Sequence, residues 1–136
     1  MPGRAFPLSP GSTRDLEVGD FWAVALADGT FGACQVTDLK RAGIGARTTL
    51  VAGVLDWSGA EPPTTETLSG VALLAQGLVG VEVFTKGGAT IIGNAPLVEG
   101  GQEWPSPFRD FAVGTVTQTW GWKSLPGRVA STLARP

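Results

Sequence analysis

The residue types that could perform catalysis are scarce in this chain of 136 residues. It contains no His and no Tyr, which excludes Ser-His-Asp and Cys-His catalysis as well as histidine metal sites. Its one cysteine, Cys34, lies in an apolar stretch typical of a strand, where a thiol is more often core packing than a nucleophile. We therefore expect no enzyme activity, no metal site and no cofactor.

Two acidic residues, Asp56 and Glu61, lie close together on either side of a Trp-Ser-Gly-Ala sequence. Such a pair could act as the acid and base of a glycosidase-like reaction. Surface carboxylates beside a turn are the simpler interpretation, because unpaired acids are rarely buried. Glycines also pair at residues 43–45 and 87–88, but without the Lys-Ser/Thr sequence of a phosphate-binding loop. These motifs favour a binding protein over an enzyme.

Acidic and aromatic residues occur together in the middle of the chain. Residues 52–110 contain seven acidic and two basic residues, a balance of −5, whereas the whole chain has a net charge of −2. We expect a basic protein partner to bind there, with a tryptophan ring at the centre and carboxylates around it. The alternatives are a solvated acidic face and tryptophans that close the ends of a small barrel. The candidate partner-binding residues are Asp56, Trp57, Glu61, Glu103 and Trp104.

Length and composition favour one domain that is rich in strands. A length of 136 residues is typical of one domain, and 43% hydrophobic residues suffice for a core. The 20 glycines and 10 prolines require frequent turns, which suit strands better than a helical bundle. The charge balance does not favour nucleic-acid binding, which needs a basic face. One cysteine, no signal-peptide pattern and no apolar run of about 18 residues predict a cytoplasmic protein without a membrane span.

The strands must position the candidate residues, and the first two are predicted around Asp28-Gly29. This dipeptide between two apolar runs favours a two-residue type I′ hairpin. Such a turn places Trp22 on the same face as Ala33, and Phe21 on the same face as Cys34. Both faces are apolar, so we expect both to be covered by other parts of the protein.

Further strands and one helix follow from apolar patterns along the chain. A helix is predicted over residues 63–76, because apolar residues recur there at helical spacing. Pro63 suits its start and Gly77 the position after its end. The short strand predicted at residues 89–93 is expected to pair back on residues 78–85. The predicted strands cover residues 47–57, 78–85, 111–122 and 89–93.

These elements predict the α+β class, mainly β. We expect a curled antiparallel sheet or small open β-barrel with one packed helix. Residues 1–15 are expected to be a flexible N-terminal segment and residues 16–124 the single β-rich domain. Residues 125–136 are expected to be flexible or a frayed helical tail.

Two segments of the chain contain short motifs in a definite order. In residues 16–36, the motifs are Gly19-Asp20, Asp28-Gly29 and Phe31-Gly32. In residues 87–108, they are Ile92-Gly93, Pro96-Leu97 and Pro107-Phe108. In type, order and separation these motifs resemble the bacterial immunity protein 26 family, over about residues 16–122. One difference is Ala89-Thr90, where the family often has an aromatic residue.

The resemblance implies a cytoplasmic immunity protein of a polymorphic toxin system. Such a protein would bind its cognate toxin domain and neutralise it by occlusion, and the motifs transfer no catalytic residue. A protein of another class also fits the residues: a small β-barrel adaptor or ligand-binding module without a toxin partner. An enzyme that uses carboxylates is a third reading, which the absence of His disfavours. A neighbouring gene for a large secreted toxin would distinguish the first reading from the second.

Overall fold

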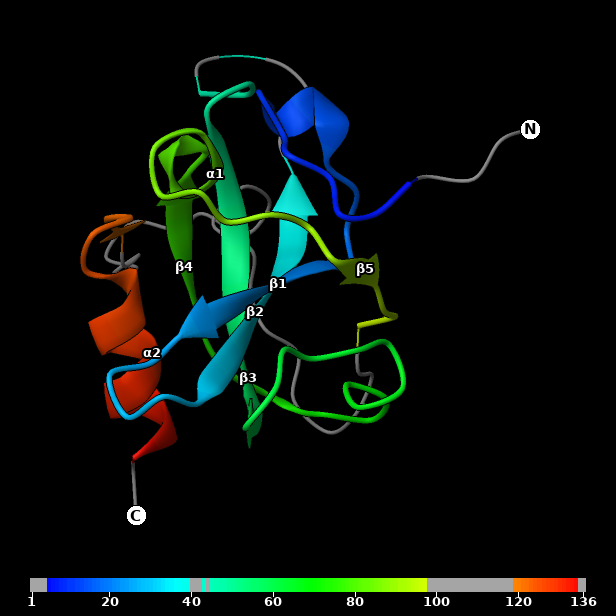
Figure 1. Cartoon of the computed structure of the whole chain (residues 1–136). Coiled ribbons are helices and arrows are strands. Elements are labelled where there is room, and N and C mark those ends of the chain that lie inside the picture. The colour runs from blue at the N-terminus through cyan, green and yellow to red at the C-terminus, as the bar shows by residue number, and fades with distance from the viewer. Residues whose placement is uncertain (1–4, 40–42, 44, 98–118, 135–136) are drawn as a thin grey trace, which may run out of the picture.

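A six-stranded sheet forms the centre of the part of the chain that the structure describes (Figure 1). This computed structural model describes residues 5–39, 43, 45–97 and 119–134. The strands run in the sheet order β5-β1-β2-β3-β4-β6, and neighbours are antiparallel except for β4 and β6. The predicted α+β, mainly β class is confirmed, with an open sheet of mixed strand direction. The bounds are β1 Asp20–Ala25, β2 Phe31–Leu39, β3 Thr49–Gly59, β4 Leu73–Gly80, β5 Gly93–Asn94 and β6 Thr119–Trp120.

The first hairpin has a three-residue loop instead of the predicted two-residue turn. The Gly29 N–H donates to the Leu26 carbonyl at 3.1 Å, and the Leu26 N–H donates to the Thr30 carbonyl at 2.9 Å. Gly29 has φ +87°, and no described non-glycine residue has positive φ. These hydrogen bonds describe a tight turn that begins at Leu26 and is followed by Gly29 in the left-handed region. This is the three-residue hairpin loop that ends in a β-bulge. Asp28 Oδ1 accepts from the Thr30 N–H at 2.9 Å and thereby braces the loop.

The longer loop shifts the pairing of β1 with β2 by one residue. Trp22 pairs with Cys34 and Ala23 with Ala33, whereas the two-residue turn would pair Ala23 with Cys34. The predicted faces are therefore wrong, because a shift of one residue moves a strand's side chains to the other side. Trp22 packs in one cluster with Cys34, and Phe21 packs in the other with Ala33.

Hydrophobic clusters cover both faces of the sheet, as the two apolar faces of the hairpin predict. The larger cluster forms around Trp22 and includes residues of the helix α2 (Leu125–Leu133). The smaller cluster forms around Phe21 and includes Leu68 from the connection between β3 and β4. Both ring systems are 0% exposed, so the first hairpin lies at the centre of the core.

The helix predicted over residues 63–76 is wrong. Residues 65–70 form turns, and β4 already begins at Leu73. Gly70 takes φ +74°, outside the right-handed helical region. The Thr64 N–H donates to the Thr67 hydroxyl at 2.8 Å, a side-chain bond that competes with helix formation. Leu68 is buried although it lies in a turn. Apolar residues at helical spacing can therefore be buried here without forming a helix.

The packed helix instead comes from the segment expected to be flexible or frayed. α2 (Leu125–Leu133) buries Leu125, Val129 and Thr132 and lies beside β1, β2 and β3 (Figure 1). A Cβ at Gly32 of β2 would lie 2.6 Å from a methyl group of Val129, which is too close. Glycine at this position therefore permits the close contact between the helix and the sheet. Two shorter helical segments also occur, η1 (Thr13–Asp15) and α1 (Glu82–Thr85).

Two further predicted elements differ in the structure. The strand expected over residues 78–85 is divided between the end of β4 and α1. The predicted pairing of residues 89–93 with residues 78–85 is also wrong, because Gly93 pairs with Phe21 of β1 instead. Leu8, in the segment expected to be flexible, forms a bridge with Ile91.

Among the described residues, no helix is long and apolar enough to cross a bilayer.

Candidate functional site

The predicted partner-binding residues that the structure describes lie where β3 ends. Asp56 and Trp57 are in β3, and Glu61 follows shortly after it. Both carboxylates are exposed, whereas Trp57 is half-buried against the smaller cluster. Leu55 packs on that cluster too, so strand alternation directs Asp56 to the opposite face. Asp56 and Trp57 are therefore neighbours in the chain but do not share one surface.

The indole of Trp57 is held across the backbone of Gly59. A Cβ at Gly59 would lie 2.8 Å from Cζ2 of the ring, so only glycine leaves room for it. A ring fixed in this way keeps part of its apolar surface exposed at little entropic cost, which suits the centre of a protein interface.

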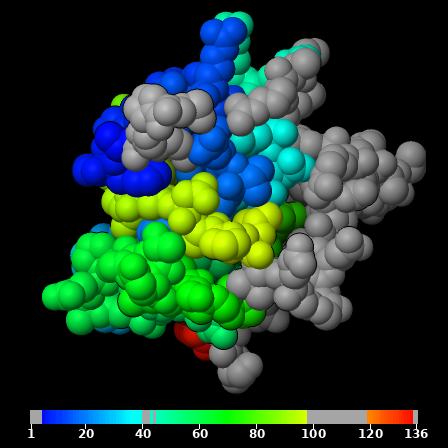
Figure 2. All heavy atoms as spheres, turned by 90° about the vertical axis from the view of Figure 1, so that its right-hand side faces the viewer, coloured from blue at the N-terminus to red at the C-terminus, as the bar shows by residue number. Residues whose placement is uncertain are grey.

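The connection from β3 to β4 is acidic and contains no base. Asp56, Glu61 and Glu66 are exposed, and no Lys or Arg occurs between Arg47 and Lys86. Figure 2 shows this connection, in green, projecting from the molecular surface. We call the three exposed carboxylates the acidic end. The other predicted pair, Glu103 and Trp104, lies outside the described residues.

Two of the six short motifs, Gly19-Asp20 and Ile92-Gly93, lie together where β1 meets β5. Asp20 pairs with Asn94, and Phe21 pairs with Gly93. The Asn94 side-chain amide donates to Asp20 Oδ1 at 2.9 Å and to the Val18 carbonyl at 3.1 Å. Asp20 is 0% exposed, and its other oxygen accepts from a backbone N–H. These residues form a structural junction, which we call the clasp.

Gly19 and Gln35 complete the clasp. The Gln35 amide donates to the Ala95 carbonyl at 2.8 Å, and the Ala95 N–H donates to the Gly19 carbonyl at 3.0 Å. Gly19 has φ +97°, and a Cβ there would lie 2.6 Å from the Ala95 oxygen. Glycine is therefore required at this position for two independent reasons. These buried residues support the fold.

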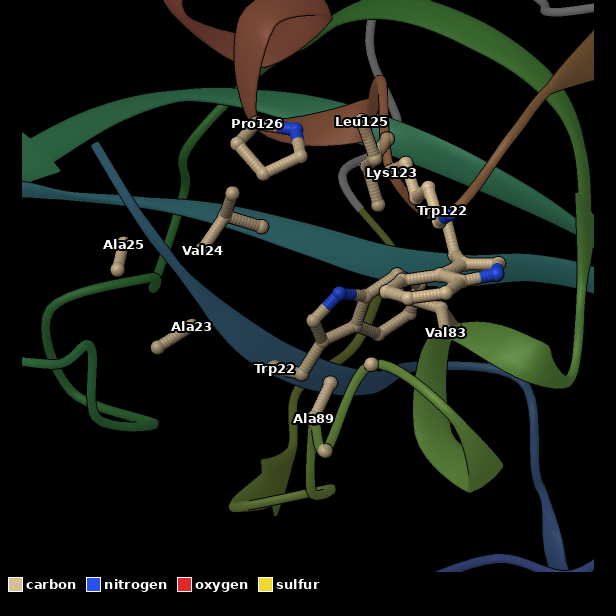
Figure 3. A pocket seen from close by; sticks show the side chains of 12 residues that line it. Trp22, Ala23, Val24, Ala25, Val83, Ala89, Trp122, Lys123, Leu125 and Pro126 are labelled. Atoms are coloured by element: carbon tan, nitrogen blue, oxygen red, sulfur yellow. The ribbon is translucent and has the colours of Figure 1, made fainter. Parts of the chain in front are cut away.

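A pocket of about 470 Å³ opens between β1, the loop after α1 and the start of α2 (Figure 3). Its volume lies within the range of about 300–1,000 Å³ that is typical of small-molecule sites. The described side chains of the walls are mostly apolar, and their polar groups are the indole N–H groups of two tryptophans and one lysine ammonium. The walls include Trp22, Val24, Val83, Trp122, Lys123 and Leu125.

The Trp22 indole N–H in this wall is a buried donor with no acceptor among the described residues. The ring packs edge-on against Phe84, with centroids 5.1 Å apart. In Figure 3 the nitrogen lies on the edge of the ring turned toward Val24 and Pro126. A buried donor without a partner costs about 1–3 kcal/mol. Such groups are rare in folded proteins and call for a specific explanation.

Lys123 and Trp122 stand beside the same pocket. The Lys123 ammonium lies 5.4 Å from the centroid of the Trp122 ring, a cation–π arrangement. Lys123 is exposed, and Trp122 is half-buried against the larger cluster. Sequence reasoning placed Trp122 near a strand end but did not recognise the pocket. No local pattern in the sequence indicates the pocket, because its walls come from separate elements.

The described residues offer little for covalent or metal chemistry. Burial raises the pKa of the Cys34 thiol from 9.0 to about 12, which keeps the thiol protonated and unreactive at neutral pH. Among the described residues, no three His, Cys, Asp or Glu side chains are grouped so as to hold a metal ion.

Three comparisons with known proteins gave no match. No family model matches the chain, and no curated protein or solved structure is significantly similar to it. The acidic end, the clasp and the pocket are therefore the features from which a function can be inferred.

Proposed function

We propose that this chain is an immunity-type binding protein, which occludes the active site of a basic toxin domain and performs no catalysis itself. The observation that carries the proposal is the acidic end, with Asp56, Glu61 and Glu66 exposed on a stretch without a base. Toxins that act on nucleic acid need a basic site to hold phosphates. An acidic protein competes directly with that substrate.

Electrostatic complementarity gives this kind of inhibitor its fast association with the toxin and its specificity for it. Opposite charges on the two surfaces steer the encounter and accelerate association. Carboxylates at the rim exclude wrong partners, while a desolvated aromatic ring supplies binding energy at the centre. Trp57 offers such a ring, fixed over Gly59 and half-exposed, and Glu61 and Glu66 on the connection that follows would form its rim. Asp56 lies on the other face of the strand, so it would contribute to steering and not to this rim.

The resemblance to the immunity protein 26 family supports the same function. Its motif residues Gly19, Asp20 and Gly93 lie in the clasp, so they would serve the fold and not the contact with the toxin. We also propose a cytoplasmic location, where the single Cys34 would remain reduced. The toxin domain is the expected partner, and neither nucleic acid nor a membrane is part of the proposal.

Capture from a host lysate with the full tagged chain tests this function. The wild-type protein should retain a basic protein, and Glu61→Lys should reduce its recovery severalfold. Glu82→Lys is the matched control, because Glu82 is also exposed and lies beyond the opposite end of β4. Recovery of an acidic partner, or equal recovery with both variants, would refute the proposal.

A ligand-binding module remains the second candidate function. The specific observation in its favour is the pocket beside Trp22, whose buried N–H has no described acceptor.

A further inference from the structure

We propose that the pocket between β1, the loop after α1 and the start of α2 binds a small amphipathic carboxylate. Its carboxylate would accept from the Trp22 N–H and face Lys123, and its apolar body would lie against the aliphatic wall. This site is separate from the acidic end, so it holds whether or not the chain is an immunity protein.

The walls supply donors and no acidic group. Among the described lining residues, the polar side-chain groups are the indole N–H groups of Trp22 and Trp122 and the Lys123 ammonium. Each of these donates hydrogen bonds and none accepts them. A ligand that complements them must therefore bring acceptor oxygens, and the ammonium favours oxygens with negative charge.

The Trp22 N–H gives the strongest indication of where an acceptor belongs. It is buried, it lacks a described partner, and Figure 3 shows its nitrogen on the ring edge facing Val24 and Pro126. The rest of the ring is fixed by its edge-on contact with Phe84. The direction of the donor is therefore fixed, and because Trp22 is 0% exposed, the side chains of Val24 and Pro126 must move apart for an acceptor to reach it.

Lys123 can supply the opposite charge. Its ammonium rests over the Trp122 ring at 5.4 Å, and the side chain is exposed. A cation in this position is directed along the aromatic wall. An incoming carboxylate can thus gain a charge-assisted bond while Trp122 covers its apolar part.

The aliphatic walls and the glycine loop accommodate the body of the ligand. Val24, Val83 and Leu125 line the pocket from three different elements. Gly87 allows the loop to approach, because a Cβ there would lie 2.7 Å from the Val83 carbonyl and 3.2 Å from the Trp122 ring. A branched or linear hydrocarbon chain fits against these three aliphatic side chains.

Titration of the isotope-labelled full chain with octanoate tests the proposal by nuclear magnetic resonance. The indole N–H signals of the five tryptophans are observed directly, and Trp22→Phe identifies the Trp22 signal by its loss. Octanoate should shift the Trp22 signal downfield in a saturable manner, because the N–H gains an acceptor. Octanol, with the same hydrocarbon chain and no charge, should bind more weakly.

Surface variants keep the test independent of folding. Lys123→Gln should weaken octanoate binding about two- to fivefold, the size of an exposed ion pair, and leave octanol binding unchanged. Lys86→Gln is the control, since Lys86 is exposed outside the described pocket wall. Absence of a saturable Trp22 shift would overturn the proposal. Equal affinity for octanoate and octanol would also overturn it, because the pocket would then not recognise a carboxylate.

Discussion

The side-chain amide of Asn94 donates a 2.9 Å hydrogen bond to the buried carboxylate of Asp20, 74 residues earlier in the chain. This contact joins the start of β1 to β5 at one edge of the sheet. A carboxylate that is 0% exposed is tolerated only when both its oxygens find donors. Asp20 meets this condition, because its second oxygen accepts from the Glu17 N–H at 2.9 Å.

Replacement of Asp20 by alanine should destabilise the domain by about 2–4 kcal/mol. The Glu17 N–H, in a part-buried hydrogen bond, would lose its charged acceptor, and the Asn94 amide would lose one of its two acceptors. Chemical denaturation measures the change. Asp56→Ala is the matched control, because Asp56 is exposed, and it should shift stability by less than about 0.5 kcal/mol. Equal midpoints for the two variants would mean that the clasp is not a structural junction.

Gly29→Val should destabilise the domain by about 1–3 kcal/mol through backbone strain alone. Gly29 has φ +87°, and a Cβ there would meet nothing within 4 Å, so crowding does not contribute. Gly29→Asn should cost less, because asparagine tolerates the left-handed region. Thermal or chemical denaturation of both variants checks this. Identical losses for valine and asparagine would show that the conformation of the loop is not the cause.

Cys34→Ala should remove part of the loss of stability at alkaline pH. Burial raises the folded-state pKa of Cys34 from 9.0 to about 12. Stability from the neutral thiol is therefore complete below about pH 9, and it falls as pH rises toward 12 by about 1.4 kcal/mol per unit. The difference in unfolding free energy between wild type and variant should shrink across this window. A constant difference would contradict a buried, protonated thiol.

Val129→Ala should destabilise the domain by about 2 kcal/mol, because Val129 is 0% exposed and packs α2 on the sheet. Arg128→Ala, at an exposed position in the same helix, controls for helix propensity and should be nearly neutral. A frayed tail, as expected from the sequence, would instead make both substitutions neutral. Denaturation midpoints distinguish the two cases.

Local patterns predicted the existence of the first hairpin but not its register. Asp28-Gly29 serves equally well in a two-residue turn and in the observed three-residue loop with Gly29 in the left-handed region. The same limit applies to residues 63–76, where apolar spacing suits a helix but φ +74° at Gly70 belongs to a turn. In both places the choice depends on packing with distant parts of the chain.

The candidate sites show the same division between local and long-range information. The exposure of Asp56 and Glu61 followed from their charge and their place beside a turn. The clasp joins residues far apart in the sequence, so no local pattern could show it. The unpartnered N–H of Trp22 was equally hidden, because hydrogen-bond satisfaction depends on everything packed around the ring.

The most direct test of the acidic end is the rate of association with the captured partner, measured at several ionic strengths. Glu61→Lys should slow association severalfold at low salt and make it less sensitive to added salt, because steering through the acidic end is weakened. Trp57→Ala should mainly speed dissociation, since the ring acts after contact is made. Glu82→Lys, with the same change in net charge, should have a smaller effect on both. Wild-type association rates and salt dependence in Glu61→Lys would contradict binding through this surface.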